Sequence, residues 1–436
     1  MQATINNTNI PNIVIEISDS LIKNGYRAFI VGGAVRNSLL GFDVKDWDIA
    51  TNASPDRIRK LFHYMTSFNL KHGTVTLVSK GSHFEVTTFR GKESFAMNIE
   101  EDLSHRDFTL NAMAYNIADN IIIDPFYGRQ DIRKKAIRAV GSALERFQED
   151  PLRMMRAVRF SLELGYTIDL DTLNGISSMK GAIDKVSIER IRDEFLKILT
   201  AEKPSVGFNL LRKTGLLTRI MPELLEGYGK RQNNYHKYTI YRHIMETVDF
   251  IERDPILRLS ALFHDIAKPR VREKIDGRWR FFNHPSSSAE LARDIMMRMR
   301  FSNEWINIVT GLVLNHMFDY KKDLSDRAIR RLVKKVGINN IGRLISLRRA
   351  DDLAHGWGKV PEKGLNDFEE RIDALRKKSP PLNISDLKIN GNDVMDELSL
   401  NPSPEIGRIL NKLLEAVIEE PELNEKDKLI KKLSTI

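Results

Sequence analysis

The sequence predicts an α+β fold in which a mixed head is followed by a long helical body. Over roughly the first 140 residues, short strand-like runs such as YRAFIVGG, TVTLVSKG and HFEVTTFR alternate with turns, which is typical of a unit built from strands and helices. From about Glu145 to Ile436, apolar residues recur at helical spacing instead. At 436 residues the chain is long enough for two to four domains.

The composition favours a folded protein with a phosphate-rich partner. Hydrophobic residues make up 42% of the chain and charged residues 29%, and the net charge of +9 suits nucleic acid. Because the chain has no cysteine, disulfides and thiolate zinc sites are excluded, and any metal must bind oxygen or imidazole ligands. No apolar run approaches the roughly 20 residues of a membrane span, and the N-terminus lacks the basic region of a signal peptide. We therefore expect a cytoplasmic protein without a membrane partner.

The stretch VGGAVRNSLLGFDVKDWDIAT, Val31–Thr51, contains a tight turn that can receive a triphosphate. Gly32 and Gly33 end a buried strand and open a short helix that stops at Gly41. The turn lacks the Gly-Lys-Ser/Thr of a Walker loop and the third glycine of a dinucleotide fingerprint. Free backbone N–H groups at the helix start still suit a phosphate, and Arg36, one turn into the helix, adds positive charge.

The Asp-Trp-Asp sequence in the same stretch predicts a metal site. Residues two apart in a strand share a face, so Asp46 and Asp48 project together while Trp47 and Ile49 point into a core. Two neighbouring carboxylates repel each other unless a cation lies between them, and Mg²⁺ accepts one or two carboxylates together with substrate phosphates. The alternative is an exposed acidic strand edge that binds nothing.

The segment EDPLRMMRAVRF, Glu149–Phe160, predicts a helix with one polar stripe. Proline is tolerated at the first helical position, so we expect the helix to start at Asp150 and Pro151. The polar stripe consists of residues three apart, Asp150, Arg153, Arg156 and Arg159. A carboxylate can accept a hydrogen bond from the C4 amine of cytosine, and a guanidinium can donate to its O2 or N3. The alternative is a salt-bridged surface helix.

Together with HRDFTLNAMAYN (His105–Asn116) and DPFYGRQDI (Asp124–Ile132), these motifs resemble those of the class II tRNA nucleotidyltransferase and bacterial poly(A) polymerase family. The resemblance is dense over residues 25–225 and resumes near the C-terminus in LKINGNDVMDELSLNPSPEIGRIL. It implies a polymerase-β-like nucleotidyltransferase head followed by an all-α neck, a body with an HD domain, and a tail. The implied boundaries are 1–140 for the head, 141–225 for the neck with its nucleotide-templating helix, 226–375 for the HD body and 376–436 for the tRNA-binding tail.

The resemblance also implies roles for the motif residues of the head and neck. Asp46 and Asp48 would bind the catalytic Mg²⁺ ions, with Glu85 as a further candidate carboxylate. The incoming nucleotide would be contacted through its phosphates and sugar by Gly33, Arg36, Arg106, Asp107 and Asn111. The polar stripe would select the base, with Asp150 and Arg153 as a protein template for C or A and Arg156 and Arg159 behind them. An RNA 3′-hydroxyl would attack the triphosphate in line and release pyrophosphate, which needs no nucleophilic side chain.

The helical body contains a second candidate metal site, which resembles that of the HD metal-phosphohydrolase superfamily. The matching residues are His243, His264, Asp265 and Asp351. His284 and His316 stand where members with two metals have extra ligands. Imidazole and carboxylate ligands suit Mn²⁺, Fe, Co or Ni, and a metal-bound water could attack a phosphoester. In this family the domain goes with hydrolysis of phosphate monoesters or 2′,3′-cyclic phosphates. The alternative is a helix surface pair, and His236, which also fits the upstream pattern, is expected to lie too far away for a ligand.

Two departures from the family pattern bear on the product. Asn37 stands where an aspartate usually follows the motif's arginine, and we expect little loss from this change. Only 15 residues, Gly91–His105, separate Arg90 from Arg106, whereas family members that add the full CCA have a longer flexible loop there, implicated in switching from CTP to ATP. The short segment favours addition of CC, with the last A left to a partner enzyme. Full CCA addition is the alternative.

The sequence therefore predicts a tRNA 3′-end nucleotidyltransferase whose partners are tRNA and CTP, and also ATP if a full CCA end is made. The nearest rival is a poly(A) polymerase, which shares the head but takes ATP only. From another class, the chain could be an RNA-binding protein with an inactive head, although the intact Asp46, Asp48, Asp150 and Arg153 argue against this. A third alternative is that HD hydrolysis is the main activity and the head supplies RNA specificity.

Overall fold

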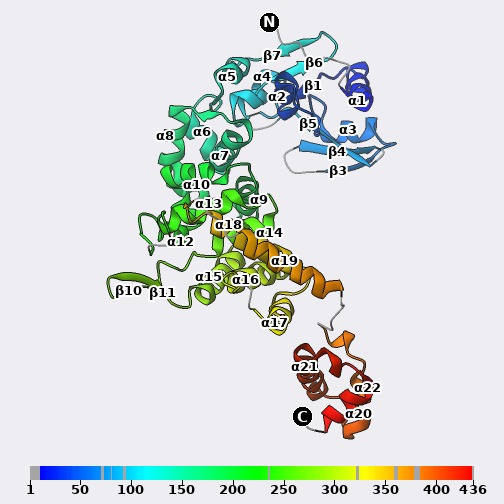
Figure 1. The fold of residues 1–436 in the computed structure, drawn as a ribbon. Coiled ribbons are helices and arrows are strands. Elements are labelled where there is room, and N and C mark those ends of the chain that lie inside the picture. Colours follow the sequence, from blue (N-terminus) through cyan, green and yellow to red (C-terminus); the bar gives the residue numbers. More distant parts are fainter. Residues whose placement is uncertain are drawn as a thin grey trace. The chain divides into compact units, whose positions relative to one another are not determined.

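The structure of the protein, a computed structural model, describes residues 10–69, 73–79, 81–91, 95–233, 236–320, 324–357, 362–377 and 383–434. The chain forms two units, Met1–Ile220 and Met221–Ile436. The first unit carries a seven-stranded sheet and the helices that follow it, whereas the described part of the second is helical apart from one hairpin (Figure 1). The predicted α+β class is confirmed. The division into four domains stays a prediction.

The head is built on a sheet with the strand order β3-β4-β5-β2-β1-β6-β7. Its strands are β1 (Ala28–Val31), β2 (Asp48–Thr51), β3 (Thr66–Asn69), β4 (Thr74–Ser79), β5 (Ser82–Thr88), β6 (Ala114–Asn116) and β7 (Ile121–Ile123). The neighbouring strands run antiparallel except β2 and β5, which are parallel. The apolar run that predicted a buried strand is β1, all of whose residues are buried.

The two faces of the sheet follow the alternation of the strands. On one face, Trp47 and Ile49 lie in a core with α1 (Asn12–Lys23), α2 (Gly33–Leu40) and α3 (Pro55–Leu61). Trp47 is 6% exposed and Ile49 is fully buried, as predicted from their spacing. Ala50, two residues after Asp48, lies in a separate core on the other face. The alternation therefore keeps Asp48 away from the core that holds Trp47.

In the chain, α4 (Ile99–Ser104) and the 3₁₀ turn η3 (Thr109–Asn111) lie between β5 and β6, and α5 (Gly128–Lys134) follows β7. A short parallel pair is formed by β8 (Ala136–Ile137) and β9 (Thr167–Ile168). The neck helices are α6 (Ala143–Glu149), α7 (Arg153–Leu164), α8 (Leu170–Met179), η4 (Lys180–Lys185), α9 (Ile188–Leu199), α10 (Pro204–Lys213) and α11 (Leu217–Ile220).

The predicted start of the helix that carries the polar stripe, with Pro151 as its first residue, is wrong by two residues. α7 begins at Arg153, and Asp150 instead ends α6 with an extended backbone, φ −145° and ψ 98°. The residue before a proline is disfavoured in the helical region, so Pro151 explains the break at Asp150. The other end is as predicted, because Gly165 closes α7 in the left-handed conformation with φ 66°.

The second unit begins with α12 (Pro222–Leu225) and continues through α13 (Ile240–Phe250), α14 (Pro255–Phe263), α15 (His284–Arg298), α16 (Asn303–Asn315), α17 (Asp326–Val336), α18 (Ile341–Leu353) and α19 (Glu362–Lys377). The hairpin of β10 (Arg272–Ile275) and β11 (Arg278–Phe281) interrupts the body, which was expected to be all-α. The C-terminal elements are η5 (Ile384–Asp386), α20 (Gly391–Leu398), α21 (Pro404–Glu419), η6 (Pro421–Leu423) and α22 (Lys426–Leu433), and they share a core of their own. Within the described ranges, no helix combines the length and apolar character needed to cross a bilayer.

Candidate active site and histidine cluster

The first unit contains a cavity of about 410 Å³, here called the head pocket, between the Gly-Gly turn, β2 and α7. Its lining residues are Gly32, Gly33, Arg36, Asp48, Arg90, Arg106, Asp107, Asn111, Asp150, Leu152, Arg153, Arg156, Arg159, Phe160 and Arg190. The predicted nucleotide-binding residues are thus brought together, although they come from segments more than a hundred residues apart in the sequence. Asp46 is exposed, two residues before β2 begins, and is not among the lining residues.

The Gly-Gly turn and Arg36 form the end of the pocket that was expected to receive phosphates. Gly32 has φ 70°, a left-handed backbone that favours glycine, and a Cβ atom there would lie 2.9 Å from Arg106 Nη1 and displace that guanidinium. Arg36 Nη1 donates to Asn111 Oδ1 at 2.6 Å, and its Nε and Nη2 donate to Asn37 Oδ1 at 3.0 and 2.9 Å. Asn37, which replaces the usual aspartate, thus still orients the neighbouring arginine.

Asp48 lies among further carboxylates around β2, whose charges act on its own. Burial, together with the charges of Glu85 and Asp46, raises the pKa of Asp48 to about 6, although Arg106 partly opposes the shift. Glu85 is the partner of Asp48 in the parallel β2–β5 register. A divalent cation beside Asp48 would relieve this repulsion, and an oxygen-only donor set of this kind fits Mg²⁺. Asp46, Asp48 and Glu85 stay the predicted ligands, and of these three only Asp48 lines the head pocket.

Asp107 connects the turn after α4 to the polar stripe. Its Oδ2 accepts from Arg156 Nε and Nη2 at 2.9 and 2.7 Å, and its Oδ1 accepts from Asn111 Nδ2 at 3.0 Å and from the Phe108 N–H at 2.8 Å. Although burial acts to raise it, the pKa of Asp107 is lowered to about 2 by the Arg156 charge and these hydrogen bonds. Asp107 therefore uses both carboxylate oxygens to hold Asn111 and Arg156 in place.

The arginines of the polar stripe line the head pocket and are held in place by their neighbours. Arg153 Nη2 donates to the His105 carbonyl at 2.7 Å, and its Nη1 donates to Glu149 Oε2 at 2.9 Å. Arg159 is 9% exposed, and its Nε donates to Glu194 Oε2 of α9 at 2.7 Å. The guanidinium of Arg159 also lies 4.1 Å from the ring centroid of Phe160. Arg159 thus lines the head pocket together with Asp150 and Arg153, and Glu194 and Phe160 hold its guanidinium in place.

The segment between Arg90 and Arg106, on which the CC prediction depends, is only partly described, because residues 92–94 lie outside the described ranges. Its second half forms α4, and Ala96 N–H donates back to the Phe89 carbonyl at 2.9 Å. Asp102, fully buried, accepts from the Arg90 N–H at 3.0 Å and from Arg106 Nη2 at 3.0 Å. The segment is therefore tied at both ends to arginines of the head pocket.

In the second unit, the six predicted HD residues lie together and are buried, and we call them the histidine cluster: His243, His264, Asp265, His284, His316 and Asp351. His243 Nε2 lies 3.0 Å from Asp351 Oδ1, 3.3 Å from Asp265 Oδ2 and 3.1 Å from His264 Nε2. On the other side, Asp265 Oδ1 lies 3.4 Å from His284 Nε2 and 3.7 Å from His316 Nε2. Asp265 therefore lies with one carboxylate oxygen near His243 and His264 and the other near His284 and His316.

The histidines of the cluster are oriented from behind by backbone carbonyls. The Nδ1 atoms of His243, His264, His284 and His316 lie 2.7–3.2 Å from the carbonyl oxygens of Ala354, Ala261, Phe281 and Val313. These hydrogen bonds orient the rings so that each Nε2 is aimed into the cluster, and in the neutral imidazole, with the proton on Nδ1, Nε2 is the atom that can bind a metal. Both carboxylate oxygens of Asp265 and the Nε2 atoms of His284 and His316 are buried and make no hydrogen bond of regular geometry, although Asp265 Oδ2 is ion-paired with Lys268. These buried atoms fit one or two metal ions.

Charge in the cluster also favours a cation. Burial acts to lower it, but Asp265 and Asp351 raise the pKa of His264 to about 10. Lys268 Nζ already lies 2.5 Å from Asp265 Oδ2. The cluster opens into a cavity of about 610 Å³ that is also lined by Lys268 and by aromatic residues, among them Trp279 and Phe282.

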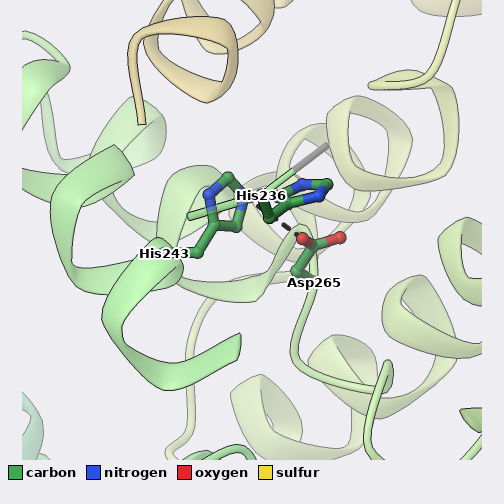
Figure 2. Close-up of side chains that lie close together, drawn as sticks. All are labelled: His236, His243 and Asp265. Carbon is green, nitrogen blue, oxygen red and sulfur yellow. Dashed lines mark ion pairs between the residues drawn. The ribbon is translucent and has the colours of Figure 1, made fainter. Parts of the chain in front are cut away.

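The expectation that His236 lies too far from the cluster is wrong. Figure 2 shows its ring beside His243 and Asp265, and the three side chains offer ligand atoms within 4.8 Å of one another. The ring centroids of His236 and His243 are 4.9 Å apart. Its Nδ1 pairs with Asn233 Oδ1 at 2.9 Å. The six residues between His236 and His243 in sequence span a turn into α13, and their number alone did not reveal how close the two rings lie.

Some residues of the head pocket were missed by sequence reasoning. Arg90 ends the strand TTFR, Phe160 closes the EDPLR motif, and Arg190 belongs to the segment ERIRDEF of α9. For Arg190 a signal existed, because a charged segment at helical spacing follows the neck motif. Its hydrogen-bond partner Asp150 lies 40 residues earlier in the chain, and this pairing could not be predicted from the sequence alone.

Comparison with family models identifies three regions of the chain. Residues 28–138 match a model described as "Poly A polymerase head domain". Residues 165–227 match one for an RNA and SrmB binding site of polymerase A. Residues 273–433 match one for tRNA nucleotidyltransferase domain 2. The matches follow one another along most of the chain.

Whole-chain relatives agree with these matches. A CCA-adding enzyme of Lactobacillus gasseri is 32% identical over 426 residues, covering 94% of this chain and 95% of the relative. One of Lactococcus lactis subsp. lactis is 30% identical over 423 residues, covering 94% and 93%. Among solved structures, the CCA-adding enzyme of Bacillus stearothermophilus in complex with CTP superposes with a TM-score of 0.70 at 29% identity, covering 97% of this chain and 96% of that one.

Proposed function

The chain belongs to the family of CCA-adding enzymes, which are tRNA nucleotidyltransferases, and we propose that it transfers CMP from CTP to the 3′ end of tRNA without a nucleic-acid template. The observation that carries this proposal is the head pocket, where Asp48, the arginines near the Gly-Gly turn and the polar stripe of α7 line one cavity. The structure of the relative with CTP supports CTP as the substrate.

Asp46 and Asp48 would hold the Mg²⁺, which when bound lowers the pKa of the RNA 3′-hydroxyl and neutralises charge on the triphosphate. Arg36 and Arg106 would bind the phosphates beside the N–H groups of the Gly-Gly turn. Asn111 holds Arg36, and Asp107 in turn holds Asn111, so the phosphate contacts are set before the nucleotide arrives. Positioning and charge then suffice for transfer, because the hydroxyl itself is the nucleophile.

Base selection would fall to the first two residues of the polar stripe. The carboxylate of Asp150 would accept from the amine at C4 of cytosine or C6 of adenine, and the guanidinium of Arg153 would donate to a ring nitrogen or to O2. Uracil and guanine present a carbonyl where the amine would be, so their lone pairs would face the carboxylate. The proposed specificity for C and A thus follows from one acceptor and one donor side chain.

We further propose that the product ends in CC, because the segment that follows Arg90 is short. Of Gly91–His105, the part from Ile99 onward is helix, and Ala96 is bonded back to Phe89. Asp102 of this helix accepts a hydrogen bond from Arg106 and so fixes the end of the segment. Little chain is left for the rearrangement that would admit ATP after CTP. A separate A-adding enzyme would then complete the end.

The test uses tRNA that lacks its CCA end, Mg²⁺, and CTP and ATP singly and together, followed by sequencing of the 3′ ends. CC ends with both nucleotides present are expected. A complete CCA end would overturn the restriction to CC while leaving the tRNA nucleotidyltransferase activity in place. Long A tails with ATP alone would instead indicate the poly(A) polymerase, and no incorporation at all would indicate an RNA-binding protein with an inactive head.

We propose a second activity for the histidine cluster, metal-dependent hydrolysis of phosphate monoesters or 2′,3′-cyclic phosphates. Its supporting observation is the set of buried ligand atoms on Asp265, His284 and His316, which make no hydrogen bond of regular geometry and are aimed at one another. A bound Mn²⁺, Fe, Co or Ni would supply a water of lowered pKa, and Lys268 is placed to bind a phosphate oxygen. Asp265→Asn should abolish hydrolysis of 2′,3′-cyclic AMP by the metal-loaded protein. Equal rates in the two proteins would refute the assignment.

A further inference from the structure

Asp150, the proposed acceptor for the base, is held by an arginine of another helix. Arg190 Nη2 donates to Asp150 Oδ2 at 2.8 Å, and Nη1 donates to Oδ1 at 3.3 Å. Asp150 comes from the break between α6 and α7, whereas Arg190 lies in the first turn of α9. Both residues line the head pocket, and the side chain of Asp150 is 26% exposed.

We propose that Arg190 is a positioning residue for base selection, which fixes the plane of the Asp150 carboxylate so that it can accept from the amine of cytosine or adenine. This inference rests on the proposed role of Asp150 as the base acceptor. It adds a residue outside the α7 stripe to the specificity of the head pocket.

The hydrogen-bond capacity of Asp150 explains why its orientation needs fixing. An ionised carboxylate offers about four acceptor sites. The Leu152 N–H occupies one on Oδ1 at 3.2 Å, and the two Arg190 donors occupy one on each oxygen, which leaves room for an incoming amine. The terminal torsion of an aspartate has a broad energy profile, so the backbone contact alone would not hold the plane of the group. A guanidinium fork does hold it, because two parallel donors fit one carboxylate.

A fixed carboxylate discriminates better than a rotating one. Cytosine and adenine offer an N–H to it, whereas uracil and guanine offer a carbonyl oxygen at the corresponding place. If the carboxylate can turn away, the correct bases lose a hydrogen bond and the wrong bases lose a repulsion. Loss of Arg190 should therefore weaken binding of CTP and, at the same time, reduce the preference for CTP over UTP.

The competing explanation is that Arg190 and Asp150 form an ordinary surface ion pair, since the Arg190 side chain is 53% exposed. The first unit contains a matched pair for comparison. Arg219 donates two hydrogen bonds to Asp184, the two side chains are 47% and 45% exposed, and neither lines the head pocket. A role in base selection would separate Arg190 from Arg219, whereas a role in surface stability would not.

The experiment measures CMP and UMP incorporation on tRNA without a CCA end by the full chain, its variants Arg190→Ala and Arg190→Lys, and the control Arg219→Ala. For Arg190→Ala, KM for CTP should rise about tenfold, with a smaller change in kcat, and the CTP-over-UTP preference should fall about tenfold. Arg190→Lys should recover part of the preference, because an ammonium keeps one charged donor but not the fork. Arg219→Ala should stay within about twofold of the wild type.

A double-mutant cycle with Asp150→Ala separates the possible failures. If Arg190 acts through Asp150, adding Arg190→Ala to Asp150→Ala changes the base preference no further. A further loss in that background would overturn the inference, as would an unchanged preference in both Arg190 variants. If Asp150→Ala itself leaves the preference intact, the proposed function of the stripe fails. If Asp150→Ala changes the base preference but neither Arg190 variant does, only the proposed role of Arg190 is refuted.

Discussion

Asp48 and Glu85 are register partners in the parallel strands β2 and β5, so their two carboxylates lie side by side on the same face of the sheet. With burial, the charge of Glu85 raises the pKa of Asp48 to about 6. Because the ordinary value is 3.8, the folded protein holds a proton on Asp48 that the unfolded chain has released. In the absence of metal, stability should therefore fall as the pH rises from about 4 to 6.

The first prediction is that Mg²⁺ and a proton compete for Asp48. Below about pH 6, the Mg²⁺ concentration for half-maximal CMP incorporation should rise, by up to about tenfold per pH unit for one displaced proton. Glu85→Gln should move this rise to lower pH, because one of the charges that raises the pKa of Asp48 is gone. Measurement of Mg²⁺ activation between pH 5 and 8 checks both points. Weaker Mg²⁺ activation of Glu85→Gln at pH 8 would instead identify Glu85 as a metal ligand.

The second prediction concerns the ion pair between Asp107 and Arg156. The pKa of Asp107 is lowered to about 2 from 3.8, so its contribution to stability is fully present above about pH 4 and is lost as the pH falls toward 2. Asp107→Asn should cost about 2 kcal/mol in the free energy of unfolding at pH 7, and less as the solution is acidified. Urea unfolding of both proteins at pH 7, 5 and 3 measures the difference. A cost that does not depend on pH would mean that packing, not charge, holds this contact.

The third prediction is that metal binding at the histidine cluster and nucleotide addition can be lost separately, since their residues belong to different units of the chain. His264→Ala and Asp265→Asn should lower the bound Mn²⁺, Fe, Co or Ni, measured by elemental analysis of the purified protein, and should leave CMP incorporation unchanged. His63→Ala, a change of an exposed histidine in the head, is the matched control and should keep its metal. Undiminished metal content in both cluster variants would contradict the proposed site.

The sequence predicted local relationships better than distant ones. The two-residue period placed Trp47 and Ile49 in a core, because alternation in a strand is a local property. The start of α7 was missed by two residues, because Arg153 and Met154 donate to the carbonyls three residues earlier, as in a turn, before the regular helix begins. Arg190 could not be paired with Asp150, because contacts between helices depend on how the neck packs and not on spacing within one segment.

The fourth prediction concerns Glu194, which supports the polar stripe from α9. Glu194 is 3% exposed and accepts from Arg159 Nε at 2.7 Å, with Lys197 Nζ at 3.2 Å. Removing one partner of a buried ion pair leaves the other charge uncompensated, so Glu194→Ala should lower the free energy of unfolding by about 3 kcal/mol. Glu163 is the matched control, because it bonds the same Arg159 from a side chain that is 39% exposed. Its replacement by alanine should cost less than about 1 kcal/mol. Similar costs in urea unfolding for the two variants would show that the burial of Glu194 contributes nothing, and that the stripe is held by α7 alone.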